Sequence, residues 1–193
     1  MEDEKIWESF KSGNREVFEQ IFRAHIRVLY KYGSRFTHDP ALVEDCIQDL
    51  FLDLWNKRQS LGTTDSIKRY LLGSLRRRII RKLQHKPSEN SHVEWENYDF
   101  HLELNAEDEH IATENGVAQQ KALKAAMTQL TQRQREVIYL KYFQEMSYEE
   151  IASVMEISYQ SARNLVYAAL KLMKKHMVLI KVLFLLFFDK FSH

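Results

Sequence analysis

Cysteine, proline and glycine are scarce in this sequence. Its 193 residues include one cysteine, two prolines and five glycines. One cysteine forms neither an internal disulfide framework nor a cysteine-based zinc site, so a reducing cytoplasm is the expected compartment. Few helix breakers and few alternating apolar and polar runs predict an all-α protein. The first stretch, MEDEKIWESF, is acidic and lacks the basic and apolar segments of an export signal, so export is not expected.

Motifs of common catalytic sites are also missing. The sequence contains no Gly-rich phosphate loop, no HExxH pair and no GxSxG elbow. Cys46 lies on the apolar stripe of its expected helix, where a thiol is normally inert. His25 lies on an apolar side with no second ligand one turn away. We therefore expect a binding protein rather than an enzyme, with no catalytic residue, no metal and no cofactor.

Charge is strongly segregated along the chain, although the net charge is only +1. The residues are 45% hydrophobic and 28% charged, which is typical of a soluble globular protein with one domain or two small ones. Residues 66–86 carry basic but no acidic side chains, whereas residues 87–120 carry acidic side chains and no Lys or Arg. The acidic stretch is expected to be an extended linker. Its three aromatic residues, Trp95, Tyr98 and Phe100, distinguish it from a plain solubilising spacer, which remains the alternative.

A helix-turn-helix is predicted between Leu130 and Lys175, because two helical patterns flank a short break at residues 156–158. Ser147 and Glu150 have the spacing of a capping box, and Ser158 suits the N-cap of the second helix. Helical spacing gives this second helix an apolar stripe that must face a core. The stripe comprises Ala162, Leu165, Val166, Ala169, Leu170 and Met173.

The opposite face of the second helix carries side chains suited to base edges and phosphates. Arg pairs with guanine, and Asn or Gln pairs with adenine, when a helix enters the major groove. This face comprises Tyr159, Gln160, Ser161, Arg163, Asn164, Tyr167 and Lys171. The pattern predicts recognition of duplex DNA, and an ordinary amphipathic helix with a solvated face is the alternative.

Three further helices are predicted in the first half, over about 14–32, from Asp39 onward, and over about 66–84. The second is expected to bury one stripe and leave an acidic outer face with one apolar residue. That outer face includes Asp45, Gln48, Asp49 and Leu52. The third has a basic stripe opposite its apolar one, and such a stripe binds either nucleic acid or an acidic membrane.

Two blocks resemble the extracytoplasmic-function sigma factors of bacterial RNA polymerase, which belong to the sigma-70 family. VEDCIQDLFLDLWNK is similar to region 2.2, and LTQRQREVIYLKYFQEMSYEEIA with EISYQSARNLVYAALKLMKK is similar to region 4. The resemblance covers roughly residues 14–175. It implies two small helical domains, a region 2 bundle over 1–86 and a region 4 helix-turn-helix over 118–176. The acidic linker is then 87–117, and an apolar tail follows over 177–193.

The resemblance also implies partners and sites. Core RNA polymerase would dock on Asp45, Gln48, Asp49 and Leu52, and the recognition helix would bind the −35 duplex. An anti-sigma factor is a further expected partner. The melted −10 strand would meet the loop and basic helix of region 2, at Leu61, Gly62, Thr63, Thr64, Asp65, Lys68, Arg69, Tyr70, Arg76, Arg77 and Arg81.

Four positions depart from the family pattern. One is Leu165, which stands where relatives have a basic residue. Tyr70 stands where many relatives have Trp, and Arg77 where Asn is common. Glu156 stands where relatives often have Gly, and if this residue must adopt a left-handed conformation, the penalty is about 1 kcal/mol.

The segment MVLIKVLFLLFF, residues 177–188, is apolar except for Lys181. As a helix it would extend about 18 Å, short of the roughly 30 Å hydrocarbon core, so no stable membrane insertion is expected. We expect it to fold back as an extra core helix, and covering of a partner surface or peripheral contact with lipid is the alternative.

Two rival functions remain from the sequence alone. One is a helix-turn-helix regulator that does not replace a sigma factor, and it predicts dimerisation and a palindromic site. The other is a membrane-surface or scaffolding protein.

Overall fold

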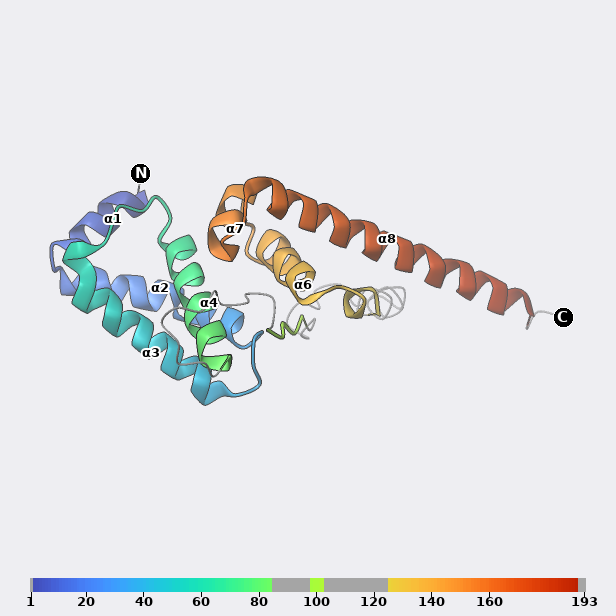
Figure 1. The fold of residues 1–193 in the computed structure, drawn as a ribbon, viewed down its shortest axis with the longest axis horizontal. Helices are drawn as coiled ribbons and strands as arrows, with labels where there is room; N and C mark the ends of the chain where they lie inside the picture. The colour runs from blue at the N-terminus through green and yellow to red at the C-terminus, as the bar shows by residue number, and fades with distance from the viewer. Residues whose placement is uncertain (1, 85–97, 103–124, 191–193) are drawn as a thin grey trace. The chain divides into compact units, whose positions relative to one another are not determined.

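The computed structural model describes residues 2–84, 98–102 and 125–190, and the side chains through residue 175. Within these ranges the regular structure is helical, as the sequence predicts (Figure 1). The chain forms two compact units, one of residues 1–99 and 149–158, the other of residues 100–148 and 159–193.

The first unit contains four α-helices from the N-terminal half, together with a short 3₁₀ helix and a helix from later in the chain. Their bounds are α1 Glu2–Lys11, α2 Arg15–Gly33, α3 Pro40–Lys57, η1 Arg58–Ser60, α4 Ile67–Leu83 and α7 Tyr148–Met155. The second unit contains α6 Gln132–Ile138, the π-helix η3 Tyr139–Phe143 and α8 Tyr159–Lys190.

The predicted helix starts in the first unit are confirmed by their caps. The Asn14 side chain accepts hydrogen bonds from the amides of Glu16 and Val17, and α2 begins directly after it. Asp39 accepts from Ala41 and Leu42, with Pro40 as the first residue of α3. Each cap satisfies amides that have no partner inside the helix, which is why these helices begin where the sequence places Asn and Asp.

The core of the first unit lies where α2, α3 and α4 pack together, with α1 beside them (Figure 1). An aromatic cluster joins α1 to α2 and α3, because Phe18 contacts Phe10, Phe51 and Trp55. Helix α1 contributes Trp7 and Phe10 to this core, and both are fully buried. The sequence analysis did not predict α1.

The described part of the acidic segment, residues 98–102, is packed. In the first unit, the Tyr98 ring lies 5.5 Å from the Phe36 ring. In the second unit, the Phe100 ring lies 5.8 Å from the Tyr139 ring, and the Phe100 amide donates to Gln132 Oε1 at 2.8 Å. Two of the three aromatic residues in the segment are therefore packed, Tyr98 in the first unit and Phe100 in the second. Trp95 lies outside the described residues. Residues 85–97 and 103–124, which hold the rest of the expected linker and the start of the region 4 domain expected from residue 118, are also outside them.

Helix α6 begins with a capping box. Thr131 accepts from the Gln134 amide, and the Gln134 side chain accepts from the Thr131 amide. The helix then widens into the π-helix η3, in which the Gln144 amide donates to the Tyr139 carbonyl five residues earlier. Because a π-turn contains an extra residue, positions predicted from a 3.6-residue period rotate out of register. Tyr142, which lies in this π-helix, is 54% exposed.

Helices α6 and α8 pack together in the second unit. The predicted apolar stripe of α8 supplies Ala162, Val166 and Ala169 to the core, all fully buried. Leu165 and Met173 are half-buried, and Leu170 is 39% exposed, so the prediction that Leu170 is buried was wrong.

The turn that leads from α7 to α8 contains a left-handed residue. Glu156 has φ of 55°, the left-handed conformation that glycine adopts most easily. Helix α8 then begins directly after Ser158.

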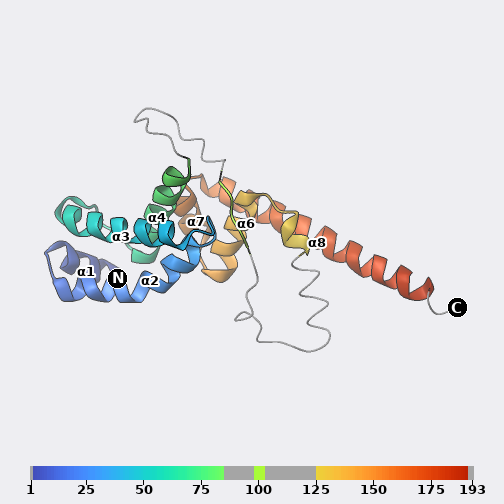
Figure 2. The ribbon, with the colours of Figure 1, turned by 90° about the horizontal axis from the view of Figure 1, so that it is seen from below.

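The apolar segment 177–188 continues α8 in both views (Figure 1 and Figure 2). It does not form a separate helix that folds back, so that expectation was wrong. Among the described residues, no helix has both the length and the apolar character needed to cross a bilayer.

Candidate nucleic-acid and polymerase-binding surfaces

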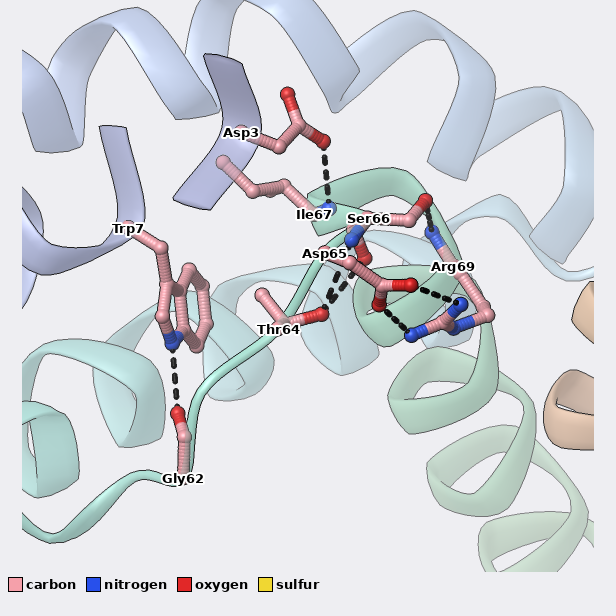
Figure 3. Close-up of polar contacts among 8 residues, drawn as sticks. All are labelled: Asp3, Trp7, Gly62, Thr64, Asp65, Ser66, Ile67 and Arg69. Atoms are coloured by element: carbon pink, nitrogen blue, oxygen red, sulfur yellow. Dashed lines mark hydrogen bonds and ion pairs between the residues drawn. The ribbon is translucent and has the colours of Figure 1, made fainter. Parts of the chain in front are cut away.

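The loop of residues 61–66 joins η1 to α4, and Figure 3 shows its polar contacts. Part of the loop is exposed to solvent. Gly62, Thr63 and Asp65 are exposed. Thr64 is only 8% exposed, and its hydroxyl accepts from the Ser66 amide at 3.3 Å and donates to the Ser66 carbonyl at 3.1 Å. The predicted contact of the Thr64 side chain with DNA is therefore corrected, because this hydroxyl shapes the loop from inside.

Helix α1 holds this loop at both ends. The indole Nε1 of Trp7 donates to the Gly62 carbonyl at 2.8 Å, and Asp3 Oδ2 accepts from the Ile67 amide at 2.8 Å. Sequence reasoning missed both residues. The signal was the helical spacing of Ile6, Trp7 and Phe10 after an acidic first turn.

A polar cavity of about 270 Å³ lies beside the loop, between α3 and α4. This volume is near the lower end of ligand pockets, roughly 300 Å³. Its lining combines arginines with an aromatic ring and one carboxylate. The lining residues include Leu61, Tyr70, Arg77, Arg78, Arg81 and Asp53. Five of these six residues belong to the loop or to α4. Such a lining suits a planar polar group next to a phosphate.

The predicted basic residues of α4 have different surroundings. Arg81 is exposed, and Lys68 is half-buried. Arg69 pairs with Asp65 within the loop region, and its hydrogen bonds hold the pKa of Asp65 below the usual value. Arg77 donates to Ser74 Oγ at 3.0 Å and pairs with Glu156 at 2.7 Å within the first unit. The surface that DNA would meet is therefore less purely cationic than the sequence suggests.

Arg76 requires a correction, because it is only 1% exposed. Its guanidinium lies 5.2 Å from the centre of the Tyr98 ring. Leu72 and Ile80, one turn away on either side, are fully buried as well. Helix α4 thus has a second buried stripe, which the four-residue spacing of its other apolar residues did not reveal. Arg76 is an interior residue and not part of the DNA surface.

The acidic face of α3 is exposed as predicted. Asp45, Gln48, Asp49 and Leu52 all face solvent, and Leu52 is 63% exposed. Asp49 Oδ2 lies 3.2 Å from Lys82 Nζ. Partial burial is the largest single influence and acts to lower the pKa of Lys82, but the hydrogen bond to Asp49 and the nearby negative charges of Asp49 and Asp45 together raise the pKa. Next to this pair, Asp53 has a lowered pKa because Arg78 donates a hydrogen bond to it.

An apolar groove of about 620 Å³ adjoins this face, between α2 and α3. Leu52 belongs to both surfaces. Phe22, which the sequence analysis placed on the buried side of α2, is 38% exposed here. The groove is lined by Phe18, Phe22, Phe51, Leu52 and Trp55, with Arg15, Glu19 and Gln48 at its polar positions. Sequence reasoning missed this groove.

The face of α8 that is predicted to recognise DNA is exposed to solvent in the structure. Its residues are all exposed, opposite the buried Ala162, Val166 and Ala169. They are Tyr159, Gln160, Ser161, Arg163, Asn164, Tyr167 and Lys171. The Gln160 amide donates to Asn164 Oδ1 at 3.0 Å, which aligns the two amide side chains one turn apart.

His25 and Cys46 show no feature of a reactive site. Burial lowers the pKa of His25 and raises the pKa of Cys46, so both are kept neutral. Within the described ranges, no three His, Cys, Asp or Glu side chains are grouped to hold a metal ion.

Residues 21–87 match the family model for sigma-70 region 2, and residues 120–173 match that for sigma-70 region 4. The chain belongs to the sigma-70 family. The two models cover the loop with α4 and the helix-turn-helix, in the order that the sequence blocks predict.

Relatives place this sigma factor among the extracytoplasmic-function type. It is 24% identical over 170 residues to the ECF RNA polymerase sigma factor SigX of Bacillus subtilis (strain 168), covering 86% of each chain. It is also 24% identical over 168 residues to the RNA polymerase sigma factor YlaC of the same organism, covering 85% of this chain and 94% of that one. Sigma factors are transcription initiation factors, and this chain acts in promoter-directed transcription.

Two solved structures share the fold of this sigma factor. CnrH, in complex with the cytosolic domain of CnrY, has a TM-score of 0.60 and 17% identity, covering 90% of this chain and 95% of that one. The sigma factor RpoE of Bartonella quintana, in complex with the anti-sigma factor NepR, has a TM-score of 0.53 and 18% identity, covering 83% and 96%.

Proposed function

We propose that this sigma factor divides promoter recognition between two surfaces. The loop 61–66 with α4 holds the melted −10 strand, and the exposed face of α8 recognises the −35 duplex. The carrying observation is that α8 presents Gln160, Arg163 and Asn164 together on one exposed face, within a chain that matches both region 2 and region 4. The role is binding, so we infer that the chain is not an enzyme.

At the −10 element, the exposed loop backbone lies next to the polar cavity. An unstacked base entering this cavity would stack near Tyr70, with Arg77 and Arg81 placed for the sugar–phosphate backbone. The free energy of holding that base offsets the cost of unpairing it, which is a few kcal/mol. Strand capture on this surface would therefore stabilise a promoter that is already open.

At the −35 element, α8 would enter the major groove. Arg163 is suited to guanine O6 and N7, and the amides of Gln160 and Asn164 are suited to adenine. Lys171, farther along α8, would contact phosphate. Acidic residues are missing from α8 before Asp189, so little local repulsion opposes the DNA.

Core polymerase would bind the acidic face of α3. Asp45, Gln48 and Asp49 supply polar contacts, and Leu52 supplies an apolar anchor continuous with the neighbouring groove. The resemblance to region 2.2 identifies the expected partner as the clamp of the largest polymerase subunit.

An anti-sigma factor is the second protein partner that we propose. CnrH and RpoE, which share the fold, are each solved with a bound partner, and the partner of RpoE is an anti-sigma factor. We place the working compartment in the cytoplasm, where polymerase and DNA are found.

Transcription in vitro with purified bacterial core enzyme tests the proposal. The full chain should confer initiation from a subset of genomic promoter fragments, which core enzyme alone does not transcribe specifically. A regulator that does not replace a sigma factor would instead bind duplex DNA as a dimer without supporting initiation. A membrane-surface protein would bind anionic liposomes without sequence preference. Either result, without association with core polymerase, would overturn the proposal.

A further inference from the structure

Helix α1 lies outside both matched family regions, yet it contacts the −10 loop at both ends. Trp7 binds the carbonyl of Gly62 near the start of the loop, and Asp3 binds the amide of Ile67 directly after its end (Figure 3). These partners are 55 and 64 residues apart in the sequence, so the contacts exist only in the folded first unit.

Asp3 supplies a hydrogen bond that α4 cannot supply for itself. Ile67 is the first residue of α4, and its amide has no acceptor inside the helix. The local cap, Ser66, accepts from the Arg69 amide instead. The Asp3 carboxylate therefore completes the cap from another helix, and its charge is favourable at a helix N-terminus. This fixes the point where the loop joins α4.

Trp7 fixes the other end of the loop. Its ring is fully buried and lies 5.2 Å from the Phe10 ring and 5.0 Å from the Tyr70 ring. A buried indole N–H needs an acceptor, and the Gly62 carbonyl supplies it. The Gly62 backbone is thereby tied to an aromatic cluster that also contains Tyr70, a residue of the polar cavity.

Between these two contacts, hydrogen bonds within the loop fix its conformation, and part of the loop stays exposed to solvent. The Thr64 hydroxyl bonds to the Ser66 backbone, whereas Thr63 and Asp65 remain exposed. A loop that is already ordered loses less conformational entropy when it binds a ligand.

We propose that Asp3 and Trp7 are positioning residues for −10 recognition: they hold residues 62–66 in the conformation that accepts an unstacked base, without touching DNA. The inference rests on the proposed role of the loop in binding the −10 strand. Discrimination between bases at −10 then depends on a helix that precedes the matched region 2.

The test uses the full chain with core polymerase and a promoter DNA with a premelted −10 segment. The non-template −10 strand and the −35 duplex are both randomised, and DNA retained in the complex is sequenced. Trp7→Phe keeps an aromatic ring but removes the N–H. Asp3→Ala removes the acceptor, and Asp3→Asn keeps an acceptor oxygen. Glu2→Ala is the matched control, because it removes the same charge from an exposed position in the same helical turn.

Wild-type protein should enrich particular bases at both elements. Trp7→Phe and Asp3→Ala should each lower −10 enrichment about fivefold, the effect of one hydrogen bond of ordinary strength. Asp3→Asn and Glu2→Ala should retain it. Enrichment at −35 and affinity for core polymerase should remain unchanged in all four variants.

Each contrary outcome has a distinct meaning. If wild-type protein selects −35 bases but none at −10, the proposed function of the loop fails. If wild-type protein selects −10 bases and Trp7→Phe and Asp3→Ala select them equally well, the positioning role is overturned while the proposed function stands. A parallel loss of −35 selection, or a loss in Glu2→Ala equal to that in Asp3→Ala, also overturns it, because general unfolding or charge would then be the cause.

Discussion

Arg76 and Arg81 both belong to α4, but their surroundings differ completely. Arg76 is enclosed in the first unit against Tyr98, whereas Arg81 is exposed beside the polar cavity. The same residue type is therefore part of the interior at one position and exposed to solvent at the other.

Replacing Arg76 by Ala should destabilise the first unit by about 2–4 kcal/mol, because the cavity and lost packing resemble those of a large core truncation. Arg81→Ala should change stability by less than about 0.5 kcal/mol. Urea unfolding followed by tryptophan fluorescence measures both, since Trp7 and Trp55 lie in this unit. Equal stability of the two variants would contradict the interior role of Arg76.

Arg163 should contribute to sequence discrimination more than to general affinity. Arg163→Ala is expected to lose about 1–3 kcal/mol of discrimination at one −35 position, because a bidentate contact with guanine is removed. Lys171→Ala should instead weaken binding to all sequences alike and reduce the salt dependence. Binding of holoenzyme to a panel of −35 variants distinguishes the two effects, and an unchanged preference in Arg163→Ala would count against this recognition face.

At the scale of elements, the turn before α8 has a measurable conformational cost. Glu156 is left-handed, with φ of 55°, and glycine adopts this conformation without the Cβ penalty. Glu156→Gly should be about 1 kcal/mol more stable than Glu156→Ala. Both variants lose the ion pair with Arg77, so their difference in denaturant unfolding isolates the backbone effect. No difference would show that the turn relaxes in solution.

The contact between α2 and α3 depends on a close approach at Gly33. A Cβ placed there would lie 2.7 Å from Val43 Cγ1 and 3.2 Å from Ile79 Cδ1. Gly33→Ala should therefore destabilise the first unit by about 1–3 kcal/mol through overpacking. Gly62→Ala is the control for stability, since a Cβ at Gly62 meets no atom within 4 Å. Thermal unfolding compares them, and equal midpoints would refute the close packing.

At the scale of the whole molecule, the chain must bind polymerase and DNA through different surfaces. Asp49→Arg should weaken binding to core polymerase at least tenfold, because it reverses a charge on the exposed face of α3 and places it beside Lys82. Glu145→Arg makes the same charge reversal on an exposed residue of the second unit. Titration of labelled core enzyme measures both affinities, and undiminished binding by Asp49→Arg would remove the docking assignment.

Much of this molecule follows from local sequence patterns. Helical periodicity, the caps at Asn14 and Asp39, and the capping box at Thr131 determined the helices and their starts. These features depend on residues within a few positions of one another, so the sequence displays them directly. The exposed face of α8 follows from the same periodicity.

Only the tertiary structure decided which residues that are far apart in the sequence lie next to one another. The enclosure of Arg76 by Tyr98, the groove between α2 and α3, and the bonds from Asp3 and Trp7 to the loop all join segments that periodicity treats separately. The π-turn after α6 likewise shifted Tyr142 outward. The physical reason is that burial and hydrogen-bond partners are set by the packing of whole helices, whereas a single helix specifies only its own apolar side.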